Sequence, residues 1–358
     1  MGVNRESRAE TARMQVVHVA GSPHEIGAAH GEQLADRIDQ CVQLYRGVFG
    51  LADAELDRRA AHFESVSRAW SPDLAIEIDA IADASGQRRS DVWAMNARSE
   101  ILAHVGVETT ECTSVLAPKL GLLAQTWDWI ADLEPLTVVL DVAHADGHRL
   151  ATVTEPGMVG KIGLSSTGVA VGLNFLSSPT RLDGVAVHVL LRGLLDARSG
   201  SDLDALLDRA GPGRSAHVFL ASRDATSGLT TGSSLEFTGD KMFRRDSTDE
   251  PLLHTNHFLL TDLITDAIPA DNSYARFARS QVLIEQGSAV SVQTVKDHLD
   301  DRVNREFPIC RKWVASPTLI GFDTGTVCSI AIRLNEGEMD VRRGHDPGGS
   351  WQTISVAR

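Results

Sequence analysis

The spacing of apolar residues changes near residue 112, and this change restricts the folds that the chain can adopt. From Ser22 to about His104, apolar residues recur on one face of a helix, and Pro23 directly after Ser22 is typical of a helix start. After Cys112, short apolar or β-branched runs are separated by Asp-Gly, Pro-Gly and Thr-Gly pairs, which predicts a meander of antiparallel strands. The sequence therefore predicts a helical N-terminal segment followed by a strand-rich region.

Paired helices interrupt the predicted strands, which favours an α+β fold of stacked sheets with helices on their outer faces. The predicted helices cover residues 22–49, 53–70, 72–84, 90–101, 185–197, 201–210, 273–285 and 291–301. The predicted strands cover residues 122–127, 136–142, 150–154, 169–176, 216–222, 229–237, 252–257, 327–334 and 338–342. Because no repeat or long linker divides the chain, we expect one structural unit in which a helical segment, 1–111, packs on a core, 112–358.

The composition is that of a globular protein, and its charge disfavours some partners. Apolar residues make up 42% and charged residues 23% of the 358 residues, and 48 acidic against 34 basic residues give a formal net charge of −14. This acidic excess disfavours binding to nucleic acid or to anionic membrane surfaces. The polar N-terminus lacks the apolar stretch of a signal peptide, and no apolar run reaches the about 18 residues of a membrane span. We therefore expect a cytoplasmic protein with no membrane partner.

The cysteines and histidines do not form a disulfide framework or a metal-binding pattern. The four cysteines are scattered, with no CxxC pair, at Cys41, Cys112, Cys310 and Cys328. His254 and His257 fall in a predicted strand, where side chains three residues apart point to opposite faces, and a third ligand is not apparent. We expect no metal and no cofactor.

Cys112 is the candidate nucleophile, because it opens the strand-rich region. A cysteine attacks as its thiolate and needs a base, but the sequence around Glu111-Cys112-Thr113 lacks the context of a papain-like protease. If the bond between Glu111 and Cys112 were cut, the free α-amine of Cys112, with a reference pKa of roughly 7.7–8.0, would serve as the base. The sequence therefore favours a precursor that cleaves itself into chains of residues 1–111 and 112–358.

Four later residues suit the supporting roles in this chemistry. Asp128, in Trp127-Asp128-Trp129, is the candidate carboxylate beside the α-amine. Asn174 and Asn256 are candidate donors to the oxyanion that forms at the attacked carbonyl. Arg276 is the candidate cation that orients the thiolate or the carboxylate.

Six motifs occur in an order that resembles the penicillin acyltransferase family of N-terminal-nucleophile hydrolases. A more distant similarity is to the choloylglycine hydrolases, which include penicillin V acylase. The motifs, which span most of the chain, are Gly21–Gly27 with His30-Gly31, Asn96–Ile101, Cys112–Ser114, Gln125–Trp129, Gly168–Asn174 and His254–His257.

The resemblance implies a four-layer αββα sandwich, self-cleavage before Cys112, and an acyltransferase or amide hydrolase activity without a cofactor. It implies that Cys112 is the nucleophile, with Asp128 as its acidic partner and Asn174 and Asn256 as the oxyanion donors. Arg276 matches a looser motif. The implied partners are small molecules, namely an amide or acyl thioester as donor and an amine as acceptor, and the two fragments are expected to stay associated.

The chain also departs from the family pattern, and other functions remain open. Glu111 stands where the family often has glycine, and Val218 stands where many relatives have a polar residue. One alternative is a binding module of the same fold that is never cleaved. Another is a conventional cysteine amidase whose base is His217, His254 or His257. We also expect Arg98 and Glu100 to form a structural ion pair.

Overall fold

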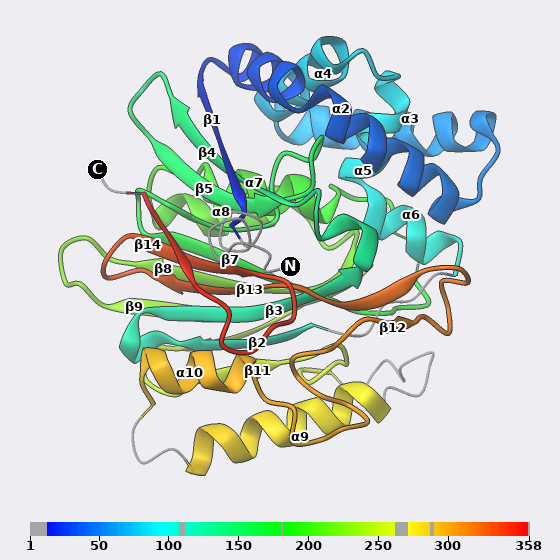
Figure 1. The fold of residues 1–358 in the computed structure, drawn as a ribbon. Helices are drawn as coiled ribbons and strands as arrows, with labels where there is room; N and C mark the ends of the chain where they lie inside the picture. The colour runs from blue at the N-terminus through cyan, green and yellow to red at the C-terminus, as the bar shows by residue number, and fades with distance from the viewer. Residues whose placement is uncertain (1–12, 107–111, 181, 262–270, 287–289, 357–358) are drawn as a thin grey trace, which may run out of the picture.

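The fold is described from a computed structural model, which covers residues 13–106, 112–180, 182–261, 271–286 and 290–356. Two β-sheets form the centre of the molecule (Figure 1). The first sheet has eight strands in the order β1 (Gln15–Gly21), β4 (Val138–His144), β5 (Arg149–Thr154), β6 (Ile162–Ser165), β7 (Val169–Phe175), β8 (Ser215–Arg223), β9 (Thr230–Thr238) and β10 (Met242–Ser247). From β4 to β10 its neighbouring strands are antiparallel, which is the predicted meander.

The second sheet has seven strands and contains the strand that follows Cys112. Its order is β11 (Leu252–His254), β2 (Thr113–Ala117), β3 (Leu122–Ile130), β13 (Asp323–Arg333), β14 (Glu338–Arg343) and β15 (Gln352–Ser355), and β12 (Val314–Ala315) pairs with β13. Strands β2 and β3 also contact β7 of the first sheet. Every residue of β2 and β3 is buried, as expected for strands that are covered on both faces.

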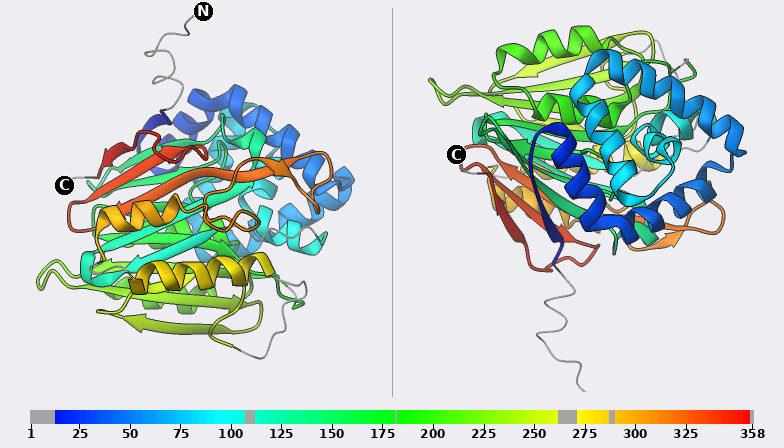
Figure 2. Two further views of the ribbon diagram at one scale, coloured as in Figure 1. Left: turned by 60° about the horizontal axis from the view of Figure 1, so that its bottom comes forward. Right: turned by 90° about the horizontal axis from the view of Figure 1, so that it is seen from above.

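Helices cover the outer faces of both sheets. On the first sheet, α7 (Val187–Leu195) packs on β6 and β7, with α8 (Ser201–Ala210) beside it. On the second sheet, α10 (Val292–Leu299) packs on β3 and β13, and α9 (Asp271–Gln286) contacts β11 (Figure 2). The predicted four-layer αββα sandwich is confirmed.

The helices before Cys112 pack on one another at one end of the sandwich (Figure 1). They are α2 (Pro23–Phe49), α3 (Asp53–Trp70), α4 (Pro72–Ser85), α5 (Arg89–Asn96) and α6 (Arg98–His104). The predicted start at Ser22 is confirmed, since Ser22 Oγ accepts from the Glu25 N–H at 3.4 Å and Glu25 Oε2 accepts from the Ser22 N–H at 2.8 Å. The single helix predicted over 90–101 is wrong, because the backbone at Ala97 (φ −111°, ψ 22°) separates α5 from α6.

The first sequence motif holds α2 against α4. A Cβ atom at Gly27 would lie 2.2 Å from the main-chain oxygen of Glu77, and one at Gly31 would lie 2.7 Å from that of Ile81. The two helices can approach this closely only because both positions are glycine. His30, in the same motif, accepts a hydrogen bond of 3.0 Å from the Gly157 N–H through Nε2. This motif therefore serves packing.

The strand β1 was not expected from the sequence. It pairs in parallel with β4, from Gln15 opposite Val138 to Gly21 opposite His144. The segment before Cys112 thus adds an edge strand to a sheet whose other strands all follow Cys112.

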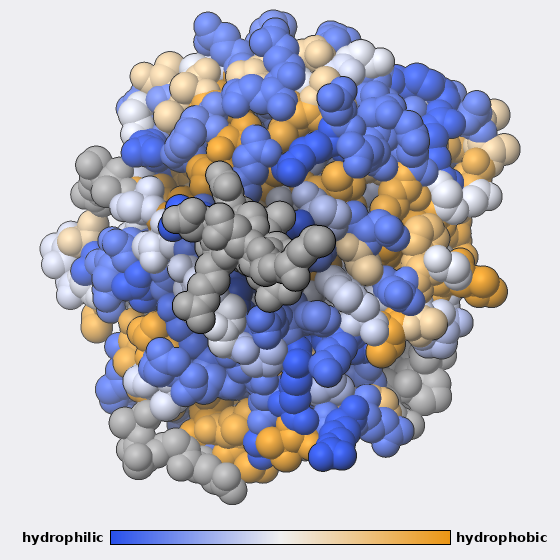
Figure 3. Space-filling view, viewed as in Figure 1, coloured by the Kyte–Doolittle hydropathy of each residue, from blue (hydrophilic) through white to orange (hydrophobic). Residues whose placement is uncertain are grey.

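The outer surface is mostly polar on the side seen in Figure 3. Hydrophilic residues predominate there, and hydrophobic residues form separate areas. Within the described ranges, none of the helices combines the length and the apolar character needed to cross a membrane.

Candidate active site

Cys112 lies at the start of β2, between the neighbouring strands β3 and β11. It is 8% exposed, and its Sγ lies 3.9 Å from the main-chain oxygen of Asp128. Burial, and then the nearby Asp128 carboxylate, raise the pKa of the thiol to about 11. The thiol is therefore protonated at neutral pH and needs a proton acceptor before it can attack. Glu111, and with it the predicted cleavage bond, lies outside the described residues.

The main-chain oxygen of Cys112 brings two of the predicted residues together. Nη1 of Arg276 donates to it at 2.7 Å, and Nδ2 of Asn174 donates to it at 3.2 Å. Arg276 comes from α9 and Asn174 from β7, so the two donors approach from different layers of the sandwich.

Arg276 links most of the predicted site. Its Nη1 also donates to Thr113 Oγ1 at 2.8 Å, and its Nη2 donates to Asn256 Oδ1 at 2.9 Å. Burial lowers the pKa of Arg276 to about 10, while Asp128 and Cys112 act in the opposite direction. The side chain therefore remains a cation at neutral pH.

Asp128 lies in the middle of β3 and is fully enclosed. Neither of its carboxylate oxygens meets the geometry of a hydrogen bond in the described part of the chain. Burial raises its pKa to about 7, although the nearby hydroxyl groups of Thr326 and Thr126 and the Arg276 cation partly offset this rise. Asp128 can therefore exchange a proton near neutral pH.

The two predicted amides each use one N–H on a main-chain carbonyl. Asn174 donates to Cys112, and Nδ2 of Asn256 donates to the Phe175 oxygen at 3.0 Å. An amide NH₂ group carries two donors, so each side chain keeps a second N–H for an oxyanion. The predicted oxyanion role is compatible with these contacts and stays a prediction.

A small cavity of about 30 Å³ adjoins Cys112 and Asp128. It has room for a water molecule and not for a substrate. Two buried cations, Arg98 and Lys161, also line it. Lys161 Nζ lies 3.4 Å above the centre of the Trp127 ring, and Arg98 lies 5.0 Å above that of Trp129.

These cations share one buried carboxylate, Glu155. Lys161 Nζ lies 2.7 Å from Glu155 Oε2, and Arg98 Nε lies 3.2 Å from Glu155 Oε1. Burial, and then the Arg98 charge, lower the pKa of Lys161 to about 7. The expected Arg98–Glu100 ion pair is wrong, because Arg98 pairs with Glu155 and Glu100 Oε1 accepts from the Val187 N–H at 2.8 Å. Lys161 was missed, although one signal for it is visible in the sequence, a lone lysine among glycine and apolar residues.

The histidines considered as alternative bases contact other groups. His217 Nδ1 lies 3.0 Å from Asn174 Oδ1, and His254 Nε2 lies 2.8 Å from Glu236 Oε1. His257 Nδ1 lies 2.8 Å from Ser273 Oγ. His217 therefore contacts the candidate site through the side chain of Asn174. This contact does not involve the Cys112 sulfur. Across the described ranges, no group of three or more histidine, cysteine or acidic residues is arranged to bind a metal.

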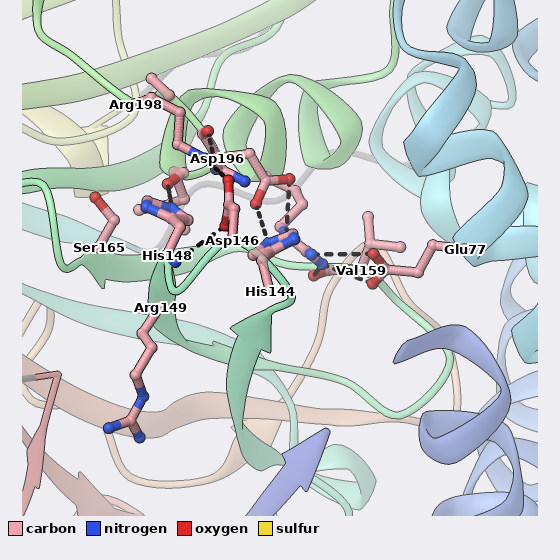
Figure 4. Close-up of polar contacts among 12 residues, drawn as sticks. Glu77, His144, Asp146, His148, Arg149, Val159, Ser165, Asp196 and Arg198 are labelled. Carbon is pink, nitrogen blue, oxygen red and sulfur yellow. Dashed lines mark hydrogen bonds and ion pairs between the residues drawn. The ribbon is translucent and has the colours of Figure 1, made fainter. Parts of the chain in front are cut away.

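A larger cavity, of about 720 Å³, lies elsewhere, among α4, α7, α8 and the end of β4. Figure 4 shows Glu77, His144 and Asp196, which line this cavity. Glu77 pairs with Arg192 at 2.6 Å, and His144 Nε2 lies 2.8 Å from Asp196 Oδ1. No predicted site residue lines this cavity. Size alone would favour it as a ligand site, but the candidate nucleophile, Cys112, and the other predicted site residues lie elsewhere.

Comparisons with known proteins agree with the motif order. No family model matches the chain. The chain is 27% identical over 311 residues to the acyl-coenzyme A:6-aminopenicillanic-acid-acyltransferase 40 kDa form of Emericella nidulans. The aligned region covers 83% of this chain and 85% of that protein. The resemblance to the penicillin acyltransferases is confirmed.

Two solved structures are also similar to this chain. A mutant of conjugated bile acid hydrolase from Clostridium perfringens has a TM-score of 0.44 and 12% identity, over 69% of this chain and 92% of that one. Penicillin V acylase from Agrobacterium tumefaciens has a TM-score of 0.44 and 13% identity, over 68% and 86% respectively.

Proposed function

We propose that this protein is an enzyme that transfers or hydrolyses an acyl group, and that its nucleophile is the thiol of Cys112. The observation that carries the proposal is the shared contact at the main-chain oxygen of Cys112, where Asn174 and Arg276 both donate. Asn174 lies on β7 and Arg276 lies on α9, and each was a candidate from the sequence. The two side chains therefore meet at the candidate nucleophile. The named relative from Emericella nidulans is an acyltransferase, which supports the same class of reaction for this chain.

The first step of the proposal is self-cleavage before Cys112. The thiol loses its proton and attacks the carbonyl carbon of Glu111, so that a C–S bond forms. The bond from that carbon to the Cys112 nitrogen then breaks, and the nitrogen takes a proton to become the free α-amine. Water hydrolyses the resulting thioester, which releases the Glu111 carboxylate and regenerates the thiol.

The uncut chain needs a different base from the mature enzyme, because its Cys112 nitrogen is still part of a peptide bond. Asp128 suits this step, since its main chain lies beside the Cys112 sulfur and burial raises its pKa to about 7. An ionised Asp128 would accept the thiol proton and return it to the departing nitrogen.

In the mature enzyme, the α-amine of Cys112 would remove the thiol proton. The thiolate would attack the carbonyl carbon of an amide or acyl thioester, and Asn174 and Asn256 would donate to the oxyanion. The amine or thiol of the substrate would leave with a proton and an acyl-Cys112 thioester would remain. Water would then complete hydrolysis, or an amine acceptor would complete transfer.

The two fragments are proposed to remain associated after cleavage. The strand β1, from the first fragment, pairs along its whole length with β4 of the second. The helix α6 also contributes Arg98 to the cavity beside Cys112.

Denaturing mass spectrometry tests the proposal. We expect the purified wild-type protein to give two chains, of residues 1–111 and 112–358, and Cys112→Ala to give one uncut chain without turnover. Cys41→Ala is the matched control, since Cys41 is a buried thiol on α2 and should leave cleavage intact. Turnover is measured on a panel of N-acyl amines and acyl thioesters.

Two outcomes would contradict the proposal. An uncut wild-type chain with full turnover would rule out activation by cleavage, and loss of that turnover on replacing His217, His254 or His257 would favour a conventional cysteine amidase. An uncut chain with no turnover and no reaction of Cys112 with a thiol-directed electrophile would favour a binding module.

A further inference from the structure

We propose that His217 is a positioning residue, which fixes the side-chain amide of Asn174 so that its NH₂ group faces Cys112. The inference rests on the proposed function of Cys112, because the amide matters only if an oxyanion forms there. It concerns a buried row of four polar side chains that ends at the Cys112 main chain. The row consists of Glu236, His254, His217 and Asn174.

The orientation of the Asn174 amide follows from its partners. The main-chain oxygen of Cys112 can only accept, so the amide atom 3.2 Å from it must be Nδ2. The other end of the amide is therefore Oδ1, which accepts from the hydroxyl of Ser114 at 2.6 Å and faces Nδ1 of His217 at 3.0 Å. The reverse orientation would place the amide oxygen against a carbonyl oxygen.

The same reasoning gives the protonation of His217. Because Asn174 Oδ1 can only accept, Nδ1 of His217 must carry a proton. Its Nε2 lies 3.0 Å from the hydroxyl of Ser234, which can donate to it. The neutral imidazole with its proton on Nδ1 satisfies both partners.

His254 explains why His217 stays neutral. The two rings stack face to face, with their centres 3.4 Å apart and their planes at 1°. Both nitrogens of His254 face acceptors, namely the Thr255 main-chain oxygen at 2.8 Å and Glu236 Oε1 at 2.8 Å. The His254 ring is therefore held in place from both nitrogens.

Two main-chain donors also contact Glu236. The N–H groups of Leu259 and Leu260 donate to its two oxygens at 2.7 and 2.9 Å. Burial, and then the stacked His254 ring, hold the pKa of His217 well below its usual value. The imidazole, amide and carboxylate side chains of this row are all buried.

The backbone gives this row its rigidity. Asn174 on β7 is the cross-strand partner of His217 on β8, and His217 is the cross-strand partner of Glu236 on β9. His254 comes from β11 of the other sheet, beside β2. The row therefore connects the two sheets at the point where Cys112 begins β2.

The proposed role predicts a specific loss when His217 changes. Without a donor at the Nδ1 position, Asn174 Oδ1 keeps only the Ser114 hydroxyl as a donor. The amide plane is then held less firmly, and its second N–H is aimed less accurately at the oxyanion. Removing a whole oxyanion donor costs about 10²–10³ in kcat, so a misaligned donor should cost about 10–100-fold, with KM changed by no more than about twofold.

Two matched variants test the inference. The amide nitrogen of asparagine and Nδ1 of histidine are the same number of bonds from Cβ, so asparagine can replace the Nδ1 donor. The amide nitrogen of glutamine is one bond further from Cβ, as Nε2 of histidine is, so glutamine cannot place a donor at the Nδ1 position. We expect His217→Asn to keep kcat and the self-cleavage rate within about threefold of wild type, and His217→Gln to lose about 10–100-fold in both. His298→Gln removes a buried histidine bonded to Ser280 on the outer face of the second sheet, and should leave both rates unchanged.

Nitrogen NMR of ¹⁵N-histidine-labelled wild-type protein gives a readout that does not depend on activity or on variant folding. We expect His217 to be neutral with its proton on Nδ1. A proton on Nε2, a charged His217, or equal effects of the asparagine and glutamine variants would overturn the inference. Absence of cleavage and turnover in the wild type would instead overturn the proposed function, and the NMR result would still decide the state of His217.

Discussion

The guanidinium of Arg276 donates to the main-chain oxygen of Cys112 at 2.7 Å, across 164 residues of sequence. This contact attaches α9 to the first residue of the predicted second chain. It holds the candidate nucleophile by its backbone and does not engage the sulfur.

Arg276→Lys should slow self-cleavage by at least about tenfold. A lysine ammonium is a single point charge and cannot reach Cys112, Thr113 and Asn256 at once, as the planar guanidinium does. The rate is measured from the appearance of the two fragments on denaturing gels. Arg279→Lys, on the same helix and paired with Asp301 near the surface, is the control. Equal rates in wild type and Arg276→Lys would contradict the positioning role.

Asp128 should make the stability of the uncut protein depend on pH. Its pKa is about 7 in the folded protein and about 4 when unfolded, so between these values only the folded state holds the proton. The contribution of Asp128 to the free energy of unfolding therefore falls as the pH rises from about 4 to 7. We expect Cys112→Ala/Asp128→Asn to gain about 2–3 kcal/mol relative to Cys112→Ala between pH 5 and pH 8.

Chemical denaturation of these two uncut variants at several pH values provides the measurement. The shared Cys112→Ala change keeps both chains intact, so cleavage cannot differ between them. If the difference between the two curves does not change with pH, folding does not raise the pKa of Asp128, and the carboxylate is a weaker base than the first step requires.

Lys161→Met should destabilise the fold by about 3–5 kcal/mol. It removes a buried partner of Glu155 and leaves that carboxylate with one cation fewer. Adding Glu155→Gln should recover part of the loss, because the unpaired charge is then gone. Lys119→Met is the control, since its ion pair with Asp249 is 2.8 Å long but exposed, and such pairs contribute little to stability. A loss as small as that of the control would contradict the assigned role of Lys161.

Gly193→Ala and Gly47→Ala should change stability in opposite directions. A Cβ atom at Gly193 would lie 2.3 Å from the Trp70 ring, and overpacking of this kind costs about 1–3 kcal/mol. Gly47, also in a helix, has nothing within 4 Å of that position, so alanine should stabilise it by about 0.5–1 kcal/mol. Thermal unfolding distinguishes the two, and a rise in Tm for Gly193→Ala would show that Trp70 can move aside.

The sequence predicted the layers of the fold because local signals determine most helices and antiparallel strands. The helix from Asp53 to Trp70 has the predicted limits. The strand β1 was missed because its partner is remote in sequence, as shown by the 2.8 Å contact between His18 on β1 and Asp141 on β4. Nothing near residue 15 in the sequence indicates where such a strand will pair.

The candidate site was predictable only in part, for the same reason. The motif order brought out Cys112 and Asn174, and a looser motif brought out Arg276. The structure brings these three together, but the polar row behind Asn174 depends on register between strands. Arg98 shows the limit of reasoning from neighbours in sequence. Residues two apart on a helix do not face each other. Arg98 therefore pairs with Glu155, which follows β5, and not with Glu100.

The parallel pairing of β1 with β4 also has a consequence for how the two fragments could be made. Without residues 1–111, β4 would be the outermost strand of its sheet, with a row of unsatisfied backbone donors and acceptors open to other chains. A chain of residues 112–358 produced alone should therefore self-associate, whereas supplying the first fragment in trans should cap that edge. In this sense the segment before Cys112 would protect its own partner from aggregation, whether or not the backbone between them is broken.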